Sequence, residues 1–228
     1  MSTVKKLSNI KLKADAKEFV SRQASLRGQI TPKINEIIKE LGVEVQKLAI
    51  PAAYYRVKEI EKNKGGKLKF KTNGDSSAVE FELSRVSFAF NNSRYAIPFV
   101  CTIGDDVEKR LNFYKKKKDP IRTWLFDLIC SYFTEKLADK MQEKVANTFK
   151  NMSATRRFSP GYCSWKLSEQ KKVFKFFKDS YVNVSLNKGY MMHPRKSVSG
   201  IFGLVEKTDK QNNPCTICPN KKCQERRA

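Results

Sequence analysis

One apolar repeat, running from Asp119 to about Phe149, limits the folds open to this chain more than any other feature. Asp119-Pro120 is a typical helix start, because the aspartate can accept from open N–H groups and proline fits the first helical position. The apolar residues that follow keep a helical period: Leu125, Leu128, Ile129, Tyr132, Leu137, Met141 and Val145. The sequence therefore predicts one long helix with an apolar face that a core must cover.

A second helix and several strands are predicted upstream of it. Thr31-Pro32 begins a helix that ends before Pro51, with apolar residues every three or four positions. From Lys67 to Gly104 the period changes to two, and Asn73-Gly74 is the turn of a predicted hairpin. The more continuous apolar run Tyr95–Ile103 is typical of a buried strand.

Further along, the sequence predicts a short helix over 167–177 and strands over 181–186 and 197–205. With 228 residues and a hydrophobic fraction of 40%, the chain is long enough to bury one good-sized core. We therefore expect an α/β (α+β) fold, with a mixed or antiparallel twisted sheet flanked by helices in a single domain. The predicted organisation is a polar N-terminal lead-in (1–28), a core (29–210) and a Cys-rich tail (211–228) packed on the core.

The formal net charge of +23 is extreme. It indicates either a solvated lysine surface or attraction to polyanions or an acidic partner protein. The positive residues are spread along the chain, with the densest run at Lys115–Lys118, and no recognised nucleic-acid-binding motif accompanies them, so binding to nucleic acid is the less favoured reading. No apolar run is long enough for a membrane span, and the start of the chain lacks a secretory signal, which predicts a cytoplasmic protein.

The segment Arg157-Phe158-Ser159-Pro160-Gly161-Tyr162-Cys163-Ser164-Trp165 has the composition of a binding loop. Pro160-Gly161 forces a tight turn, and a fixed cation and two aromatic residues flank it. Such a loop can approach a ligand that is partly anionic and partly a flat ring, although a purely structural turn is the alternative. A second distinctive segment, Met191–Gly200, contains Ser-Val-Ser-Gly and the only histidine, His193, for which an incidental or structural role is favoured.

A polar stripe runs along the predicted long helix, because Asp127, Ser131, Glu135 and Asp139 are spaced four apart and share one face. Aligned carboxylates repel one another, so positive charge should offset them. Two readings stay open. The stripe meets lysines of the protein itself in water, or it faces a cationic ligand.

The tail carries Cys215, Cys218 and Cys223, at intervals that can wrap one tetrahedral metal ion. Cys163 or His193 would complete a set of four ligands. Zinc would staple the tail, whereas an iron–sulfur cluster could pass an electron; unliganded or redox-paired thiols are the alternative. Clustered cysteines of this kind fit a reducing compartment better than a disulfide framework. The remaining cysteines, Cys101 and Cys130, are predicted to lie in the core.

Together, these motifs resemble the S-adenosylmethionine-binding activation domain of cobalamin-dependent methionine synthase, and more closely its short stand-alone relatives. The resemblance covers roughly residues 30 to 228. The residues that carry it are Arg157 to Tyr162, Trp165, Leu167, Gln170, the Met-x-Pro-x-x-Ser-Val-Ser-Gly segment at 192–200, and the tail residues Cys215, Cys218, Cys223 and Arg226.

The resemblance implies a ligand site for S-adenosylmethionine. Arg157 would pair with the carboxylate of the ligand, Glu135 would hold its amino or sulfonium group, and Tyr162 would lie against the methyl group or the corrin. Backbone groups of the turn would meet the ring or the amine. The predicted site as a whole consists of Glu135, Arg157, Ser159, Pro160, Gly161, Tyr162, Ser197 and Ser199.

The resemblance also implies a role in returning oxidised cobalamin to methylcobalamin, with one electron and a methyl group from S-adenosylmethionine. No catalytic triad is expected, because the cofactor supplies the reactivity. The chain lacks the Asp-x-His-x-x-Gly of corrinoid-binding domains, so cobalamin would be carried by a corrinoid protein or a methionine synthase core, with a flavodoxin or ferredoxin as electron donor. The alternatives are a metal-stapled protein-binding module without enzymatic activity and a basic nucleic-acid binder.

Overall fold

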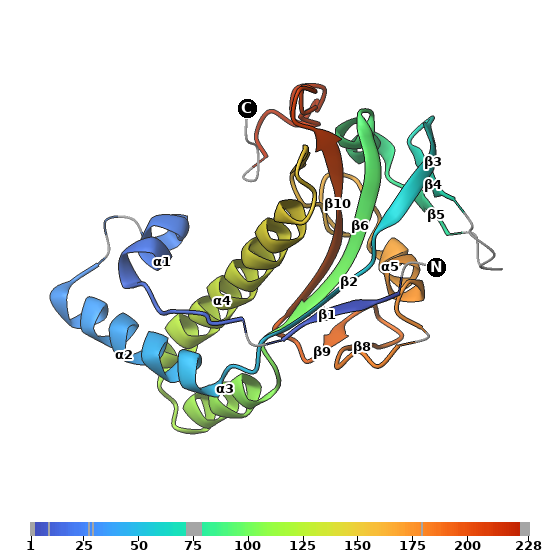
Figure 1. Cartoon of the computed structure of the whole chain (residues 1–228). Coiled ribbons are helices and arrows are strands. Elements are labelled where there is room, and N and C mark those ends of the chain that lie inside the picture. Colours follow the sequence, from blue (N-terminus) through green and yellow to red (C-terminus); the bar gives the residue numbers. More distant parts are fainter. Residues whose placement is uncertain are drawn as a thin grey trace.

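The computed structural model describes residues 3–8, 10–26, 28, 30–71, 79–178 and 180–223. A curved sheet forms the centre, with α1 to α4 on one side and α5 with the small β8–β9 hairpin on the other (Figure 1). The helices are α1 Ala16–Arg22, α2 Pro32–Leu48, α3 Asp106–Lys116, α4 Pro120–Asn147 and α5 Gln170–Lys175. Short 3-10 turns occupy Ala24–Leu26, Ser84–Phe90 and Leu167–Glu169.

The main sheet has the order β1-β2-β6-β3-β4-β5, and β10 pairs with both β6 and β7. Its strands are β1 Lys5–Leu7, β2 Ala52–Tyr55, β3 Lys58–Lys64, β4 Lys67–Phe70, β5 Glu80–Glu82, β6 Ser93–Thr102, β7 Met152–Ala154 and β10 Ser197–Glu206, while β8 Ser185–Leu186 and β9 Met192–His193 form a separate pair. Every pairing between described strands is antiparallel. The predicted α/β (α+β) fold is confirmed, in its antiparallel form.

The predicted helix starts are confirmed in detail. The Thr31 hydroxyl accepts from the Ile34 N–H at 3.3 Å and begins α2. Asp119 Oδ1 accepts from the Arg122 N–H at 2.9 Å, and α4 follows with Pro120 in its first turn. These local caps satisfy backbone donors that a helix leaves open, so they set where the two longest helices begin.

Two apolar clusters cover the two faces of the sheet, because successive side chains of a strand point to opposite sides. The first joins α1, α2, α3 and α4 to Phe99 and Phe202. The second joins α5, Phe158 and Trp165 to Ile201. As β10 contributes Phe202 to one cluster and Ile201 to the other, it separates the α4 side from the α5 side.

The N-terminal segment belongs to the first cluster. It forms β1 and α1 and buries four apolar side chains, Ile10, Leu12, Phe19 and Leu26. The predicted hairpin is confirmed by the pairing of Leu68 with Phe81, while its Asn73-Gly74 turn lies outside the described residues.

The strand predicted over 181–186 is wrong for residues 181–184, since only Ser185–Leu186 (β8) pairs in a sheet. The Asn183 N–H donates to the Tyr54 hydroxyl at 3.4 Å, so a side chain rather than a neighbouring strand receives it. Among the helices of the described ranges, none combines the length and the apolar character that a membrane span requires.

Candidate functional site

The turn after β7 is built by local hydrogen bonds around Pro160-Gly161. The Tyr162 N–H donates to the Ser159 carbonyl at 3.2 Å, and the Gly161 N–H donates to the Trp165 carbonyl at 2.7 Å. Gly161 has φ +96°, a left-handed conformation that glycine adopts without strain. Trp165 anchors the end of the turn, because its ring is 1% exposed and packs edge-on against Phe81 at 5.3 Å.

The side chain of Arg157 is directed toward α4 by the pairing of its neighbour. Phe158 forms an antiparallel bridge with Ile201, with both N–H···O distances at 2.9 Å. The Phe158 ring belongs to the cluster on the α5 side of the sheet. Because side chains alternate along an extended segment, Arg157 is placed on the α4 side.

Arg157 contacts three residues on one face of α4. Its Nη1 donates to Gln142 Oε1 at 2.7 Å, and its Nη2 donates to Asp139 Oδ1 at 2.6 Å and to Glu135 Oε2 at 3.2 Å. The Arg157 side chain is 16% exposed, whereas that of Glu135 is 54% exposed. The predicted neighbours Arg157 and Glu135 are therefore brought together, and each already has a partner within the fold.

Asp139 links this cluster to the N-terminal helix. Its Oδ2 accepts from Arg22 Nη1 of α1 at 2.8 Å, while its Oδ1 accepts from Arg157. Burial alone would raise the pKa of Asp139, but the hydrogen bond from Arg22 and the charge and hydrogen bond of Arg157 outweigh it and hold the pKa below its ordinary value. Asp139 is therefore a carboxylate shared by two guanidinium groups.

The rest of the polar stripe meets a lysine. Lys196, just before β10, donates from Nζ to the Asp127 carbonyl at 3.0 Å and to Ser131 Oγ at 2.9 Å, and pairs with Asp127 Oδ1 at 2.8 Å. Positive side chains of the protein thus offset the stripe. One of them is a lysine, as the first reading expected, whereas Glu135 and Asp139 pair with arginines.

Glycine at position 200 is required where the turn crosses β10. A Cβ atom there would lie 2.3 Å from the Phe158 carbonyl oxygen and 3.0 Å from Ser159 Oγ. Any side chain would push the turn away, so Gly200 allows the close approach. Ser159 therefore lies directly against β10, and Pro160 beside it is buried.

The serines of Ser-Val-Ser-Gly lie away from the guanidinium. Ser197 Oγ donates to the Pro194 carbonyl at 2.6 Å. Ser199 is 2% exposed and shares the α5 side of the sheet with Ile201, and its Oγ has no hydrogen-bond partner within the described part of the chain. Arg157 and Ser199 are thus on opposite faces of β10.

The outer rim of the turn is exposed. Tyr162 is 59% exposed and Leu167 is 46% exposed. Beside them, Arg85 Nη2 donates to Ser164 Oγ at 2.8 Å. His193, in β9, is exposed.

Cys101 and Cys130 are buried, as predicted, and burial raises the pKa of both thiols, that of Cys130 to about 12. Cys163 is exposed on the turn, and Cys215, Cys218 and Cys223 are half-buried in the tail. Within the described residues, no three cysteine, histidine or acidic side chains already stand at metal-binding distance.

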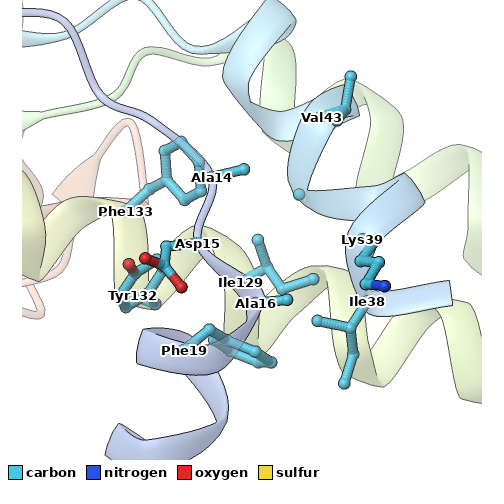
Figure 2. A pocket seen from close by; sticks show the side chains of 11 residues that line it. Ala14, Asp15, Ala16, Phe19, Ile38, Lys39, Val43, Ile129, Tyr132 and Phe133 are labelled. Carbon is cyan, nitrogen blue, oxygen red and sulfur yellow. The ribbon is translucent and has the colours of Figure 1, made fainter. Parts of the chain in front are cut away.

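A separate hollow of about 150 Å³ lies between the start of α1, α2 and α4 (Figure 2). Its walls are mainly apolar, with Phe19, Ile38 and Phe133 pointing into it and Asp15 and Lys39 at its edge. None of the predicted site residues lines it. Its volume is below the roughly 300 Å³ at which ligand pockets usually begin.

Sequence reasoning missed two members of the Arg157 cluster and placed a third, Asp139, on the polar stripe without a role at the ligand site. Gln142 lies seven residues after Glu135, so extending the helical period would have found it. Arg22 is 117 positions from Asp139, and no local pattern could indicate that contact. Asp139 nevertheless makes a shorter contact with Arg157 than the predicted site residue Glu135 does.

Comparisons with known proteins agree with this architecture. The family described as vitamin B12 dependent methionine synthase, activation domain, matches residues 88–210. Among solved structures, the chain is similar to the MetH reactivation domain bound to AdoHcy, with a TM-score of 0.59 and 12% sequence identity over 92% of this chain and 81% of that chain. No curated protein sequence matches the chain.

The matched residues run from the turn before β6 to the end of β10 and include α4 and the whole Arg157–Trp165 segment. They hold both the charge cluster on α4 and the turn that supplies its arginine. The resemblance expected from the sequence is thereby confirmed. Because the match covers more than half of the chain, this protein belongs to the family of activation domains of vitamin B12 dependent methionine synthase.

Proposed function

We propose that this chain is a stand-alone activation module, which binds S-adenosylmethionine at the Arg157 turn and supports reductive remethylation of a cobalamin carried by another protein. The observation that carries the proposal is the position of the Arg157 guanidinium, between the Pro160-Gly161 turn and the carboxylates of α4. The family assignment supplies the setting, a cobalamin-dependent methyltransferase system.

The charges around the turn fit this ligand. S-adenosylmethionine carries a carboxylate, an ammonium group and a sulfonium group, so it needs opposite charges close together. The Arg157 fork can take the carboxylate through two parallel hydrogen bonds. Glu135 is the more exposed carboxylate and makes the longest of the three contacts with Arg157, at 3.2 Å. It is therefore the partner that a cationic group can most readily draw away.

Asp139 and Gln142 would then keep the guanidinium in place. Their contacts with Arg157, at 2.6 and 2.7 Å, are the short ones, and Arg22 holds Asp139 from its other oxygen. A cation positioned in advance loses less conformational entropy when the ligand arrives. The exposed ring of Tyr162 can lie against the ligand or the corrin, and Ser159 and Gly161 offer backbone groups at the same turn.

When bound, S-adenosylmethionine supplies the methyl group, and cobalamin supplies the cobalt that receives it after reduction by a donor such as a flavodoxin or ferredoxin. The residues of this chain bind and orient. Arg157 fixes the ligand carboxylate, Glu135 faces its positive end, and Phe158 and Trp165 hold the turn against the sheet. No proton transfer by the chain is required.

The rim of the turn suits a protein partner with acidic groups. Tyr162 and Leu167 expose apolar surface. Positive charge lies next to it, because Arg85 contacts Ser164 and Lys166, just before Leu167, is exposed. The formal net charge of +23 would attract an acidic corrinoid protein or methionine synthase core and speed its association.

Titration calorimetry with S-adenosylmethionine and S-adenosylhomocysteine tests the proposal. We expect wild-type protein to bind, and Arg157→Ala to weaken binding about 10- to 100-fold, because a hydrogen bond to a charged group contributes roughly 1.5–3 kcal/mol. Arg122→Ala is the matched control. Arg122, near the start of α4, forms a two-pronged ion pair with Glu40 of α2. Replacing Arg122 therefore also removes an internal ion pair, but this pair is remote from the turn.

A second candidate function is supported by the internal pairing of Arg157. Since Glu135, Asp139 and Gln142 already hold the guanidinium in place, the turn can serve as a rigid protein-binding element without any small ligand. Wild-type protein that gives no heat with either ligand, yet still binds a corrinoid protein, would favour this module and contradict the first proposal.

A further inference from the structure

Four consecutive lysines, Lys115–Lys118, form the end of α3 and lead into α4. All four side chains are exposed. The carboxylates nearby already pair with arginines, since Glu44 pairs with Arg110 and Glu40 pairs with Arg122. None of the four ammonium groups forms an ion pair with a residue that the structure describes, so their charge is directed to the surroundings.

The last of these lysines occupies a position where glycine is the usual residue. The Lys118 N–H donates to the Lys115 carbonyl at 3.1 Å, and the Asp119 N–H donates to the Tyr114 carbonyl at 3.3 Å. These two bonds close the end of α3 in a Schellman motif, whose residue after the cap is left-handed. Lys118 has φ 54°, which costs stability for a residue with a side chain. A lysine there extends the positive run at the expense of a relaxed helix end.

Three large apolar side chains surround the lysine run. Phe113 of α3 and Ile121 and Trp124 of α4 are each between 42% and 49% exposed. The Phe113 ring centre is 5.7 Å from Lys117 Nζ. Ile121 is three residues beyond Lys118, so their Cα atoms are within about 11 Å of each other, and Trp124 shares its helix face. We call this surface the α3–α4 corner, and it consists of Phe113, Lys115–Lys118, Ile121 and Trp124.

The α3–α4 corner is separate from the ligand turn. Helix α3 and the beginning of α4 lie at the lower edge of the molecule in Figure 1. Glu135, the first partner of Arg157 along α4, is eleven residues beyond Trp124, or about 16 Å along the helix axis. A surface in contact with the corner therefore leaves the turn free.

We propose that the α3–α4 corner docks reversibly on an anionic lipid bilayer. Charge complementarity carries this assignment, because each lysine near an anionic leaflet strengthens binding roughly 5-fold. The lysines would meet the headgroups, and the apolar side chains would enter the interfacial layer, where tryptophan in particular is favoured. Such a contact is peripheral and requires no membrane-spanning segment.

The composition of the corner favours a lipid surface over other anionic partners. Protein interfaces are enriched in arginine and depleted in lysine, whereas this run contains lysine alone. A lysine can lay its methylene groups on apolar surface while its ammonium group stays among the headgroups. Single-stranded nucleic acid would stack on Phe113 and Trp124, but the aliphatic Ile121 offers no ring for a base.

Flotation of the full chain with phosphatidylcholine vesicles, with and without phosphatidylserine, tests the proposal. We expect binding only when phosphatidylserine is present, and release at high salt. The chain has two tryptophans, Trp124 and the buried Trp165. Brominated phosphatidylcholine in the anionic vesicles should therefore quench the fluorescence of Trp124 on binding. Trp124→Phe, which keeps an apolar side chain, should remove that quenching.

Three variants locate the contact. Lys116→Gln/Lys117→Gln should weaken vesicle binding about 10- to 30-fold. Lys62→Gln/Lys64→Gln removes the same charge from exposed positions of β3 and is the matched control, expected within about 2-fold of wild type. Lys118→Gly should raise the melting temperature by about 2–4 °C, because it relieves the left-handed lysine, and yet weaken vesicle binding about 5-fold.

Three results would overturn the proposal. The first is wild-type protein that stays free of anionic vesicles. The second is an equal loss of affinity in the two double variants, with melting temperatures showing that both are folded, since net charge alone would then act. The third is binding to polyglutamate without binding to vesicles, which would assign the corner to an acidic polypeptide. These measurements need neither S-adenosylmethionine nor cobalamin, so their outcome is separate from that of the proposed function.

Discussion

Two positive side chains, Lys196 and Arg157, meet the same polar stripe of α4 in different ways. They are almost equally buried, with side chains 13% and 16% exposed. Lys196 gives its ammonium group to the Asp127 carbonyl, Asp127 Oδ1 and Ser131 Oγ. Arg157 instead donates to side chains from three successive turns of the helix.

The two cations differ in how many of their N–H donors remain available for a ligand. An ammonium group has three N–H donors, and the three acceptors around Lys196 match them. A guanidinium has five donors in a planar fork, more than the three acceptors that Arg157 meets on α4. One of those acceptors belongs to the half-exposed Glu135. Similar burial thus produces a structural clamp at one end of the stripe and a cation able to receive an anionic ligand at the other.

The largest expected effect is a separation of binding from stability between these two positions. Arg157→Ala and Lys196→Ala should lower the free energy of unfolding by similar amounts, on the order of 1 kcal/mol, because each breaks partly exposed charge contacts. Only Arg157→Ala should weaken S-adenosylmethionine binding, by about 10- to 100-fold. Urea unfolding and calorimetry on the same preparations measure both quantities.

Equal losses of ligand affinity in the two variants would contradict a ligand-binding role that is specific to Arg157, since the stripe would then act as one structural unit. A third variant, Arg157→Lys, tests whether ligand binding needs the forked shape of the guanidinium as well as its charge. The charge is kept but the fork is lost, so affinity should fall between those of wild type and Arg157→Ala.

The next effect concerns the exposed carboxylate. Glu135→Gln should leave the free energy of unfolding within about 0.5 kcal/mol, because its side chain is 54% exposed and makes the longest contact with Arg157. It should weaken S-adenosylmethionine binding about 10-fold, since the ligand loses a charge partner. Glu143→Gln, farther along the same helix, is the control, and equal affinities for the two variants would exclude Glu135 from the site.

The parts of the fold that carry local signals could be predicted from the sequence. The starts of α2 and α4 follow from Thr31, Asp119 and the prolines beside them, and the period-two pattern indicates the hairpin of β4 and β5. Helix α1 was missed, because its seven residues lack a clear repeat and it depends on packing of Phe19 in the core.

The parts of the candidate site that depend on local spacing could be predicted, whereas the contacts between distant segments could not. Pro160-Gly161 indicates a turn by itself, and the spacing of Glu135 and Asp139 places them on one helix face. The direction of Arg157 depends on the bridge between Phe158 and Ile201, 43 residues apart. No local pattern contains that pairing, so the occupied state of the guanidinium could only come from the folded structure.

A smaller effect is expected at the N-terminal helix, outside the segment that matches the family. Arg22→Ala should weaken ligand binding about 2- to 5-fold, because Arg22 holds Asp139 and thereby positions Arg157 without contacting the ligand site itself. Lys17→Ala, an exposed cation on the same helix, is the control. An unchanged affinity in Arg22→Ala, with the fold intact by circular dichroism, would show that Arg157 is positioned by α4 alone.

The smallest effect is a change in acid stability at Asp139. Arg22 and Arg157 outweigh the effect of burial and hold the pKa of Asp139 below its ordinary value. The folded state therefore binds this proton less readily than the unfolded chain does. The carboxylate contributes stability at pH values above about 4, and the contribution is lost as the pH falls through the lowered pKa.

Asp139→Asn should accordingly be less stable than wild type at pH 7, by at most about 1 kcal/mol because the side chain is 39% exposed. The difference should stay constant down to about pH 5 and shrink below about pH 4, as urea unfolding across that range would measure. Asp209→Asn, at an exposed turn, should show no such convergence. A difference that persists at low pH would mean that the shape and hydrogen bonds of Asp139, rather than its charge, hold Arg157 on α4.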